Sequence, residues 1–295
     1  MRTSSAFATT ASSDLLPAII NMSAIIVILN MAIKVAFLGL GKMGRAAARK
    51  VIADGGFEVV AGFDSTCVGS DIGVLSGLDS ISVKVEDPSQ LASVLARTKP
   101  DVVVDFSSAK ACLENAKAVA QAKAAMIVGT TGFSQAELEN LKKTLSPVGA
   151  IISPNMSVGV NVFFKLVGQA AAMLKGYDIE VVEAHHNQKK DAPSGTAMRA
   201  VKVVADAIGA DMGKDVVYGR SGMSKRKEGE IGVHSIRAGD IVGEHTVMFT
   251  TEGERFEVRH VAHSRESFAS GIPQAIRFIK GRKGVFGMED VLGLK

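Results

Sequence analysis

Two histidines and two lysines stand within six residues of one another at positions 185–190, and Pro-Ser-Gly-Thr follows at 193–196. Imidazole groups can carry protons near neutral pH, and lysine ammonium groups can bind anions. Ser194 is typical of a helix N-cap, and the free N–H groups of a helix start can bind a carboxylate. The stretch from Glu183 to Thr196 therefore indicates a site that binds an anionic substrate and transfers a proton.

Two other interpretations of this stretch are open. A solvated basic turn would contain the same charges. A metal site would need further ligands, but no Cys or third His lies nearby and lysine repels a cation, so no metal is expected. His260 and His263 have the H-x-x-H spacing, but a strand would place them on opposite faces. The same alternation predicts that His185 and His186 face opposite sides of a strand and do different work.

A glycine-rich segment, Gly39-Leu40-Gly41-Lys42-Met43-Gly44, follows a predicted strand and opens a predicted helix. This G-x-G-x-x-G spacing allows a tight turn and lets a pyrophosphate approach the positive end of the helix dipole. Asp64 lies 20 residues beyond Gly44 (64 − 44), where a carboxylate can accept hydrogen bonds from the adenosine ribose. We predict a dinucleotide site, and a purely structural glycine turn is the alternative.

The residues around this segment bear on the choice of cofactor. Ser65 and Thr66 stand where an arginine would help to hold a 2′-phosphate, so NADH is favoured. Lys42 and Arg45 are close enough to keep NADPH open.

Short apolar runs alternate with helical stretches between residues 33 and 153. Strands are expected at 33–38, 58–63, 101–106, 125–128 and 150–153. Asp87-Pro88 and the capping box of Ser134 and Glu137 mark two helix starts. This alternation predicts an α/β fold, namely a Rossmann-type doubly wound parallel sheet covered by helices on both faces.

Two polar loops follow strands of this predicted sheet: Gly129-Thr130-Thr131-Gly132 and Ser153-Pro154-Asn155-Met156. Because the carboxyl ends of parallel strands form the ligand crevice, we expect both loops to line the nicotinamide. Ordinary loop composition is the alternative.

The pattern changes after Pro154. Helices are expected at 161–175 and from 194, and strands at 178–184, 231–237, 244–250 and 255–262. These runs predict a second, α+β domain with an open mixed or antiparallel sheet. A final helix is expected at 266–280. We therefore assign residues 31–156 and 265–295 to a dinucleotide-binding domain, and residues 157–264 to a substrate-binding and oligomerisation domain.

The composition excludes several classes of protein. The 295 residues include 34 Lys+Arg and 30 Asp+Glu, a net charge of +4, with 47% hydrophobic and 22% charged residues, so neither disorder nor a coiled coil is expected. Trp is absent and no dense basic run contains aromatic residues, so no nucleic-acid partner is expected. Cys67 and Cys112 are the only cysteines, which fits a reducing, cytoplasmic location.

Residues 1–30 differ from the rest and contain only Arg2 and Asp14 as charges. The apolar run at 15–29 is shorter than the roughly 20 residues of a membrane helix, so no membrane partner is expected. Translation from Met22 or Met31 would make this segment a mis-assigned start. A disordered extension, or a plastid or other targeting segment, is the alternative.

The segment from Glu183 to Ala197 resembles the Glu-x-His-His…Lys-x-Asp-Ala-Pro-Ser-Gly-Thr-Ala signature of the dihydrodipicolinate reductase family. The resemblance extends over nearly everything from Ile33 onward and includes Asp105-Phe106-Ser107, the loop at 129–132, and the runs at 155–161 and 237–246. The glycine loop departs from the family, because it is one residue shorter than G-x-x-G-[RK]-M-G.

The resemblance implies reduction of 4-hydroxy-tetrahydrodipicolinate (dihydrodipicolinate) to tetrahydrodipicolinate by NADH or NADPH, in diaminopimelate and lysine biosynthesis. Hydride reaches C4 of the ring and a proton reaches C3. By position, His185 and Lys189 are the expected proton donors. The expected substrate contacts are His186, Ser194, Gly195, Thr196 and Thr131, and Phe106 joins the cofactor site. A homotetramer built through the second sheet is also implied.

Other residues have simpler interpretations. Lys190 is expected to steer the substrate or to lie on the surface, and Arg265 to lie at a hinge or on the surface. Glu244 and His245 are expected to support domain geometry or subunit packing. Two competing functions are a different Rossmann reductase for an aldehyde or imine acid, and a nucleotide sensor without catalysis. A sensor would need the glycine loop and Asp64 but not His185 and Lys189.

Overall fold

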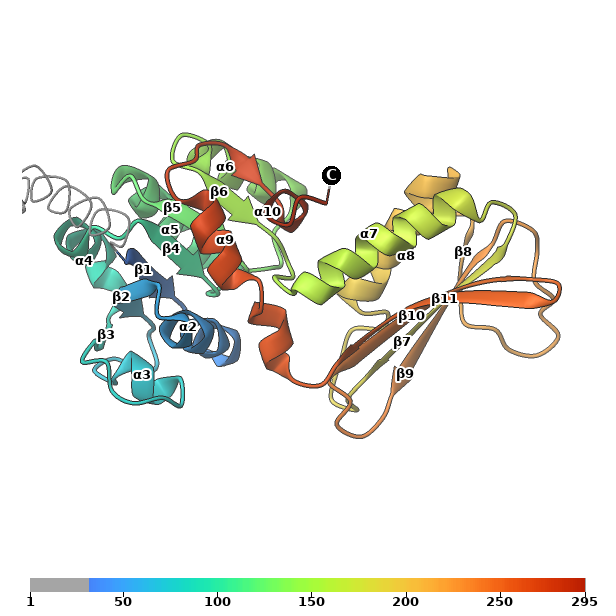
Figure 1. Ribbon diagram of the computed structural model, residues 1–295, viewed down its shortest axis with the longest axis horizontal. Helices are drawn as coiled ribbons and strands as arrows, with labels where there is room; N and C mark the ends of the chain where they lie inside the picture. Colours follow the sequence, from blue (N-terminus) through green and yellow to red (C-terminus); the bar gives the residue numbers. More distant parts are fainter. Residues whose placement is uncertain (1–31, 295) are drawn as a thin grey trace, which may run out of the picture.

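The computed structural model describes residues 32–294, which form two sheets with helices packed against them (Figure 1). The first sheet has seven parallel strands in the order β12-β6-β5-β4-β1-β2-β3. The strands are β1 (Ile33–Leu38), β2 (Phe57–Phe63), β3 (Val85–Glu86), β4 (Val102–Asp105), β5 (Ala125–Val128), β6 (Ala150–Ile152) and β12 (Val285–Phe286). The predicted doubly wound parallel sheet is confirmed.

Helices cover both faces of this sheet. One apolar cluster joins it to α2 (Lys42–Asp54), α9 (Ile272–Ile279) and α10 (Met288–Val291). The opposite cluster joins it to α4 (Leu91–Thr98), α5 (Ala109–Gln121) and α6 (Gln135–Leu145). Successive residues of β1 alternate between the two clusters and are buried in both, which is why these strands are continuous apolar runs in the sequence.

The order of the strands reverses at β1. The chain continues from β1 to β2 and β3 on one side, then returns to β4 and builds β5 and β6 on the other. In an open α/β sheet, ligands bind beside the carboxyl ends of the strands at such a point. The glycine loop follows β1 and residues 106–108 follow β4, so both lie at this edge.

The second sheet has five strands in the order β11-β10-β7-β9-β8, with parallel and antiparallel pairs. The strands are β7 (Asp178–His185), β8 (Val216–Tyr218), β9 (Ile231–Arg237), β10 (Gly243–Thr251) and β11 (Glu254–Ala262). Helices α7 (Val158–Met173) and α8 (Gly195–Ile208) pack on one face of this sheet through a third apolar cluster (Figure 1). The predicted open mixed sheet is confirmed.

Two segments connect the sheets: residues 153–157, and the 3-10 helix η2 (Arg265–Ala269). The expectation of one helix over 266–280 is wrong, because η2 and α9 are separate. Gly271 lies between them, and its N–H donates to Met156 O at 2.9 Å. A Cβ on Gly271 would lie 2.6 Å from that oxygen. The close approach of the two connecting segments therefore breaks the helix, and α9 begins at Ile272 with Pro273 in its first turn.

Several element bounds differ from expectation. Helix α7 begins at Val158 rather than Asn161, because the Ser157 hydroxyl accepts a hydrogen bond from Val160 N at 3.3 Å. The short elements α3 (Ile72–Leu75), β3, β8, β12 and α10 were not expected, and the helix expected from Asp87-Pro88 is divided into η1 (Pro88–Gln90) and α4. The expectations for residues 1–30 lie outside the described residues. No helix within 32–294 is long and apolar enough to cross a membrane.

Candidate active site

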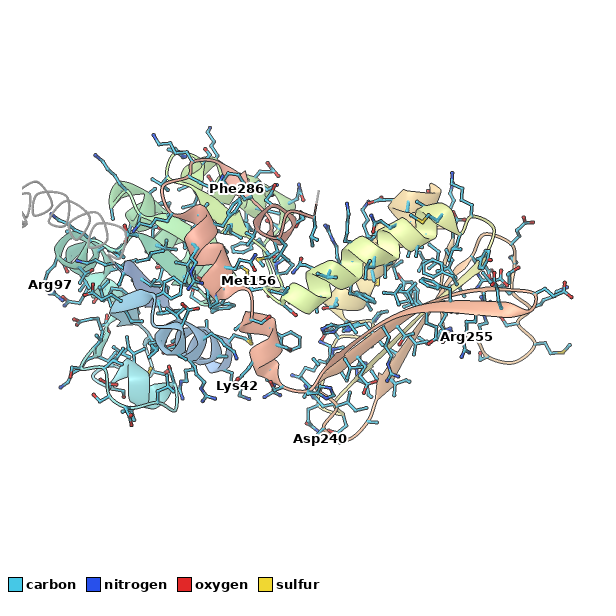
Figure 2. All side chains as sticks on the ribbon, in the orientation of Figure 1. Lys42, Arg97, Met156, Asp240, Arg255 and Phe286 are labelled. Carbon is cyan, nitrogen blue, oxygen red and sulfur yellow. The ribbon has the colours of Figure 1, made fainter. Side chains whose placement is uncertain are left out.

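The part of the chain that contains the seven-stranded sheet (the first part) meets the part that contains the five-stranded sheet (the second part) at a cavity of about 570 Å³. The first part lines it with residues at the carboxyl edge of its sheet: Met43, Phe106, Gly129, Thr131, Pro154, Asn155 and Met156. The second part contributes His185, His186, Lys189, Ser194, Gly195 and Thr196. Figure 2 shows Lys42 and Met156 on the side of the first part that faces the second. The structure thus brings residues expected to bind cofactor and residues expected to bind substrate to one cavity.

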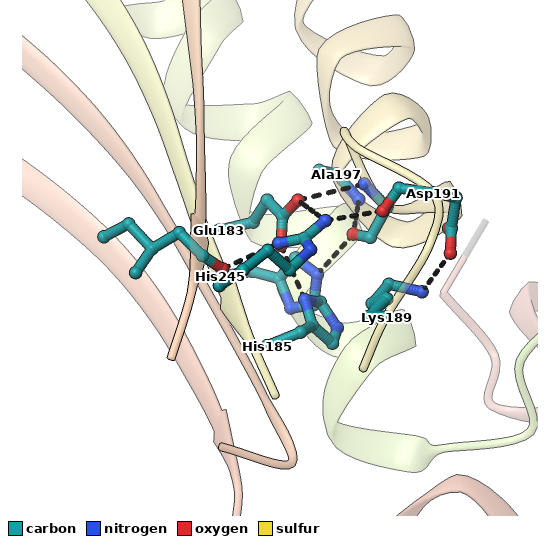
Figure 3. Close-up of polar contacts among 9 residues, drawn as sticks. Glu183, His185, Lys189, Asp191, Ala197 and His245 are labelled. Atoms are coloured by element: carbon teal, nitrogen blue, oxygen red, sulfur yellow. Dashed lines mark hydrogen bonds and ion pairs between the residues drawn. The ribbon is translucent and has the colours of Figure 1, made fainter. Parts of the chain in front are cut away.

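Glu183 is fully buried near the end of β7. Its Oε2 lies 2.5 Å from His185 Nδ1 and accepts a hydrogen bond from Arg237 at 2.9 Å. Its Oε1 accepts from Arg237 at 2.7 Å and from the backbone N–H of Ser194 at 3.1 Å (Figure 3). Burial alone would raise the pKa of Glu183, but hydrogen bonds led by those from Arg237 and His185 lower this pKa to about 2. The carboxylate is therefore ionised at neutral pH.

The ionised carboxylate determines which nitrogen of His185 carries hydrogen. A carboxylate only accepts hydrogen bonds, so Nδ1 of His185 donates to Glu183 and Nε2 is left for a ligand. Burial lowers the pKa of His185, the adjacent Glu183 raises it part of the way back, and Lys189 lowers it again. His185 can therefore gain a proton at Nε2 when negative charge is added to the cavity.

His186 lies in the same cavity as His185. The expectation that the two rings face opposite sides is wrong. Strand β7 ends at His185, so the alternation of side chains stops there and His186 belongs to the following turn.

Lys189 lies in that turn and lines the cavity. Its Nζ donates to Asp191 Oδ1 at 2.8 Å, and the Asp191 side chain is 59% exposed. An ion pair with so exposed a partner is weak and can be exchanged for another anion. The neighbouring Lys190 is exposed, as both of its interpretations required.

Helix α8 begins at the cavity. Ser194 is buried, and its Oγ accepts from Ala197 N at 3.1 Å and lies 3.1 Å from Nε2 of His245. The first N–H groups of a helix have no partner within the helix, so those of Gly195 and Thr196 are available to an anion. Burial lowers the pKa of His245 to about 3, with a further contribution from His185. His245 is therefore neutral, and its Nε2 contacts the buried Ser194 hydroxyl.

The glycine loop fits a pyrophosphate. Gly39 has φ +80°, and a Cβ there would lie 2.6 Å from Phe106 O. A Cβ on Gly44 would lie 1.8 Å from Gly39 O, so packing within the protein explains both glycines. A Cβ on Gly41 would meet nothing within 4 Å, and Gly41 is the N-cap of α2 with no side-chain hydrogen bond to the helix. Open space over an uncapped helix start is what the phosphates of a dinucleotide require.

Asp64 lies at the end of β2 beside this loop. Its Oδ2 accepts from Leu40 N at 2.8 Å, and its Oδ1 accepts from Thr66 N at 2.8 Å and from the Thr66 hydroxyl at 2.7 Å. The Leu40 side chain packs in the core, so Leu40 contributes to the loop through its backbone alone. Burial would raise the pKa of Asp64, but these hydrogen bonds and the charge of Arg45 hold the pKa below its usual value. An ionised carboxylate therefore stands where a ribose hydroxyl could donate to it.

Asp105 ties the ends of β4 and β5 together. It is fully buried and accepts from Ser107 N at 3.0 Å and from Thr130 Oγ1 at 2.6 Å. Thr130 and Ser153 are themselves buried and do not line the cavity, so their side chains stabilise the loops from the protein interior. Phe106 packs on Gly129, where a Cβ would lie 2.2 Å from the ring.

Sequence reasoning missed several residues of the site. Glu183 and Arg237 were assigned no role, although residues i and i+2 of a strand share a face and so Glu183 could have been placed beside His185. The cavity is also lined by Phe164, Arg199, Val242, Arg265 and Phe268. Arg199 lies four residues after Gly195 on α8, which puts it on the same face of the helix as the helix start.

The described part of the chain contains no group of three or more His, Cys, Asp or Glu side chains that could hold a metal ion. The strand places His260 against Phe163, with ring centroids 6.4 Å apart, whereas His263 is exposed.

A dinucleotide-binding sheet that faces an imidazole, an ammonium group and an open helix start defines a nicotinamide-dependent oxidoreductase. Comparison with known families agrees. The dihydrodipicolinate reductase N-terminus matches residues 33–156, and the dihydrodipicolinate reductase C-terminus matches residues 159–292. The chain belongs to the dihydrodipicolinate reductase family.

Curated relatives and a solved structure agree with this assignment. The 4-hydroxy-tetrahydrodipicolinate reductase of Methanothermobacter thermautotrophicus is 46% identical over 271 residues, which cover 89% of this chain and 99% of that protein. The enzyme of Methanococcoides burtonii is 46% identical over 86% of this chain and 96% of its own length. The dipicolinate-bound dihydrodipicolinate reductase of Paenisporosarcina sp. TG-14 superimposes with a TM-score of 0.71 at 30% identity, covering 89% of this chain and 100% of that one.

The chain is thus an NAD(P)-dependent oxidoreductase, and it carries out the reduction step of diaminopimelate and lysine biosynthesis for which its family is named.

Proposed function

We propose that the reduction of 4-hydroxy-tetrahydrodipicolinate by this chain is completed by a proton from His185 and Lys189. Loss of water from C4 of this substrate gives the conjugated ring, and a nicotinamide held by residues at the carboxyl edge of the first sheet would supply hydride to C4 of that ring. The electron pair displaced onto the ring must then be protonated at C3, and a positioned general acid accelerates such a step by about 10²- to 10⁴-fold. The observation that carries this proposal is the single cavity that His185 and Lys189 share with Met43, Gly129 and Asn155.

The two substrate carboxylates bind at the same wall of the cavity. The N–H groups of Gly195 and Thr196 hold one carboxylate. Lys189 releases the exposed Asp191 and binds the other substrate carboxylate. His186, Ser194 and Thr131 complete the contacts. The negative charge of the bound substrate raises the pKa of His185, so Nε2 of this residue gains the proton that it later donates.

Turnover of variants tests these roles. We expect His185→Gln and Lys189→Ala each to lower kcat by about 10²- to 10⁴-fold, because a proton donor or its charge is lost. NADH binding, followed by nicotinamide fluorescence, persists in both variants. Lys190→Ala is the matched control, because it removes an adjacent exposed ammonium group and leaves turnover unchanged. A synthase included in the assay generates the substrate. Wild-type turnover in both His185→Gln and Lys189→Ala refutes the proposal.

We propose that NADH is the preferred cofactor and that NADPH is also accepted. The ionised Asp64 stands at the ribose end of the glycine loop, where it accepts from hydroxyl groups and repels a 2′-phosphate. Arg45 lies in the same region, with its Nε donating to Leu40 O at 2.7 Å, and its charge weakens this repulsion.

We propose a homotetramer assembled through the face of the second sheet that α7 and α8 do not cover. Val182, Ala184, Ile236, Thr246 and Met248 lie on this face by strand alternation and register. Ile236 is 48% exposed, so this face presents a large apolar side chain to solvent. Ile236→Glu would place charge in such an interface, so we expect it to lower the molar mass measured by light scattering. An unchanged mass contradicts this interface.

We also propose a cytoplasmic location. Cys67 and Cys112 are free, as expected of a reducing compartment. Fluorescent fusions with and without residues 1–31 test this, and export of the full-length fusion contradicts it.

A further inference from the structure

The side chain of Glu183 connects three segments of the second part of the chain. His185 belongs to the same strand, Arg237 ends β9, and Ser194 precedes α8. These groups direct four donors at the two carboxylate oxygens, over distances of 2.5 to 3.1 Å. The side chain is wholly buried and its charge is balanced by Arg237, whose side chain is 18% exposed. Such a carboxylate has no freedom to move without breaking all of these contacts together.

We propose that Glu183 is a positioning residue for both halves of the reaction: it presents Nε2 of His185 to the substrate and fixes the helix start that binds the substrate carboxylate. This inference rests on the proposed roles of His185 and of the N–H groups of α8. Glu183 itself contacts neither substrate nor cofactor.

The first effect concerns which ring nitrogen of His185 carries hydrogen. Because the carboxylate accepts from Nδ1, the other tautomer, with hydrogen on Nε2 alone, would leave two lone pairs facing each other. The carboxylate also stabilises the imidazolium form, against the positive charges of Lys189 and Arg237 and beside the neutral His245. The protonated form of His185 therefore persists to higher pH than it would without Glu183.

The second effect concerns the backbone N–H groups at the start of α8. The Ser194 N–H is held by Oε1 of Glu183, and the Ser194 side chain caps Ala197. The remaining N–H groups of the first turn, those of Gly195 and Thr196, are left to point at a ligand. One carboxylate thereby sets the distance between the proton donor and the anion-binding helix start.

Kinetics of Glu183→Gln test this arrangement. An amide offers one acceptor oxygen to four donors and carries no charge. We expect kcat at pH 7.5 to fall by about 10²-fold or more, within the range assigned to general acid catalysis. We expect the alkaline limb of the pH–kcat profile to move to lower pH by about one unit, since the imidazolium loses its counter-charge. Glu183→Asp keeps the charge at a shorter reach and should recover part of both losses.

A matched control is available on the opposite face of the same strand. Glu180 Oε2 lies 2.7 Å from Nε2 of His234, which makes a second Glu–His pair away from the cavity. Glu180→Gln removes a comparable charge and hydrogen bond from β7. We expect its pH–kcat profile to match that of the wild type. If Glu180→Gln and Glu183→Gln shift the profile equally, the effect is a general weakening of the sheet and the proposal is overturned.

A double variant separates this inference from the proposed function. If Glu183 acts through His185, Glu183→Gln adds little further loss of kcat in a His185→Gln background. Full additivity overturns the positioning role while leaving the role of His185 intact. If His185→Gln alone has wild-type turnover, the proposed function fails first.

A tautomer measurement does not depend on how well the variants fold. In the ¹⁵N-histidine spectrum of the wild-type protein above the pKa of His185, we expect its hydrogen on Nδ1. Hydrogen on Nε2 in that spectrum overturns the proposal.

Discussion

Gly243 lies against the ring of His185, and a Cβ on Gly243 would come 3.1 Å from Nε2 and 3.4 Å from Cδ2. Gly243 is the first residue of β10, the strand that pairs with β7. The absence of a side chain at this position leaves room for the imidazole in the orientation that Glu183 imposes. A glycine that belongs to no glycine loop thus contributes to the geometry of His185, the proposed proton donor.

Gly243→Ala should misplace the imidazole without unfolding the protein. A contact of 3.1 Å requires a shift of a few tenths of an ångström, and the ring of His185 is the nearest group to the added Cβ. We expect kcat to fall about 10-fold, because small misplacements of reacting groups are costly. Gly168→Ala is the control, since its Cβ would meet Val203 at 3.0 Å, away from the cavity. Equal kcat values for the two variants would contradict the role of Gly243.

Ser194→Ala should weaken both the fold and substrate binding. Loss of the cap on Ala197 costs about 1 kcal/mol in the free energy of unfolding, as for other N-caps. Ser134→Ala removes the N-cap of α6 and should cost a similar amount. Only Ser194→Ala should raise the Kd of dipicolinate, a planar dicarboxylate, in calorimetry with NADH present. The same Kd in both variants would show that the start of α8 does not bind the carboxylate.

Asp64→Ser should change the choice of cofactor. Removing the carboxylate removes its repulsion of a 2′-phosphate, so the ratio of kcat/KM for NADH to that for NADPH should fall by about 10-fold, or 1.4 kcal/mol. Asp87→Ser is the matched control, because Asp87 also accepts from the N–H and hydroxyl of the residue two positions later. The ratio should stay at its wild-type value in Asp87→Ser. A wild-type ratio in Asp64→Ser would remove Asp64 from the ribose site.

His245 should make the fold sensitive to acid. Its pKa is about 3 in the folded chain, whereas an unfolded histidine titrates near 6.5. The unfolded state therefore binds the proton first, so this contribution to stability is complete above pH 6.5 and is lost as the pH falls toward 3. Between pH 7.5 and pH 5 the loss from this one group is about 2 kcal/mol.

Urea unfolding of His245→Gln checks this effect. The amide keeps an N–H for Ser194 but does not titrate, so the free energy of unfolding should fall less between pH 7.5 and pH 5 than in the wild type. His263→Gln replaces an exposed histidine and should follow the wild-type curve. If all three proteins lose the same free energy, another group is responsible for the acid sensitivity.

Local sequence patterns predicted most elements of the first sheet. The strand at Ile33–Leu38 and the capping box of Ser134 and Glu137 are confirmed, because burial on both faces and cap chemistry leave local signatures. The helix expected over 266–280 is wrong for a non-local reason. Gly271 is excluded from a continuous helix by its contact with Met156, 115 residues earlier (271 − 156), and no local pattern contains that contact.

The sequence by itself determined that a glycine loop precedes a helix, that Asp64 follows at the distance of a ribose partner, and that imidazoles and ammonium groups stand beside a helix cap. These features are local, since each depends on residue types at fixed spacing along one segment. The tertiary structure alone decided which residues surround the imidazole. Strand register pairs Glu183 with His245 and His185 with Arg237. That register follows from burying the apolar side of the second sheet under α7 and α8, which is a property of the whole domain.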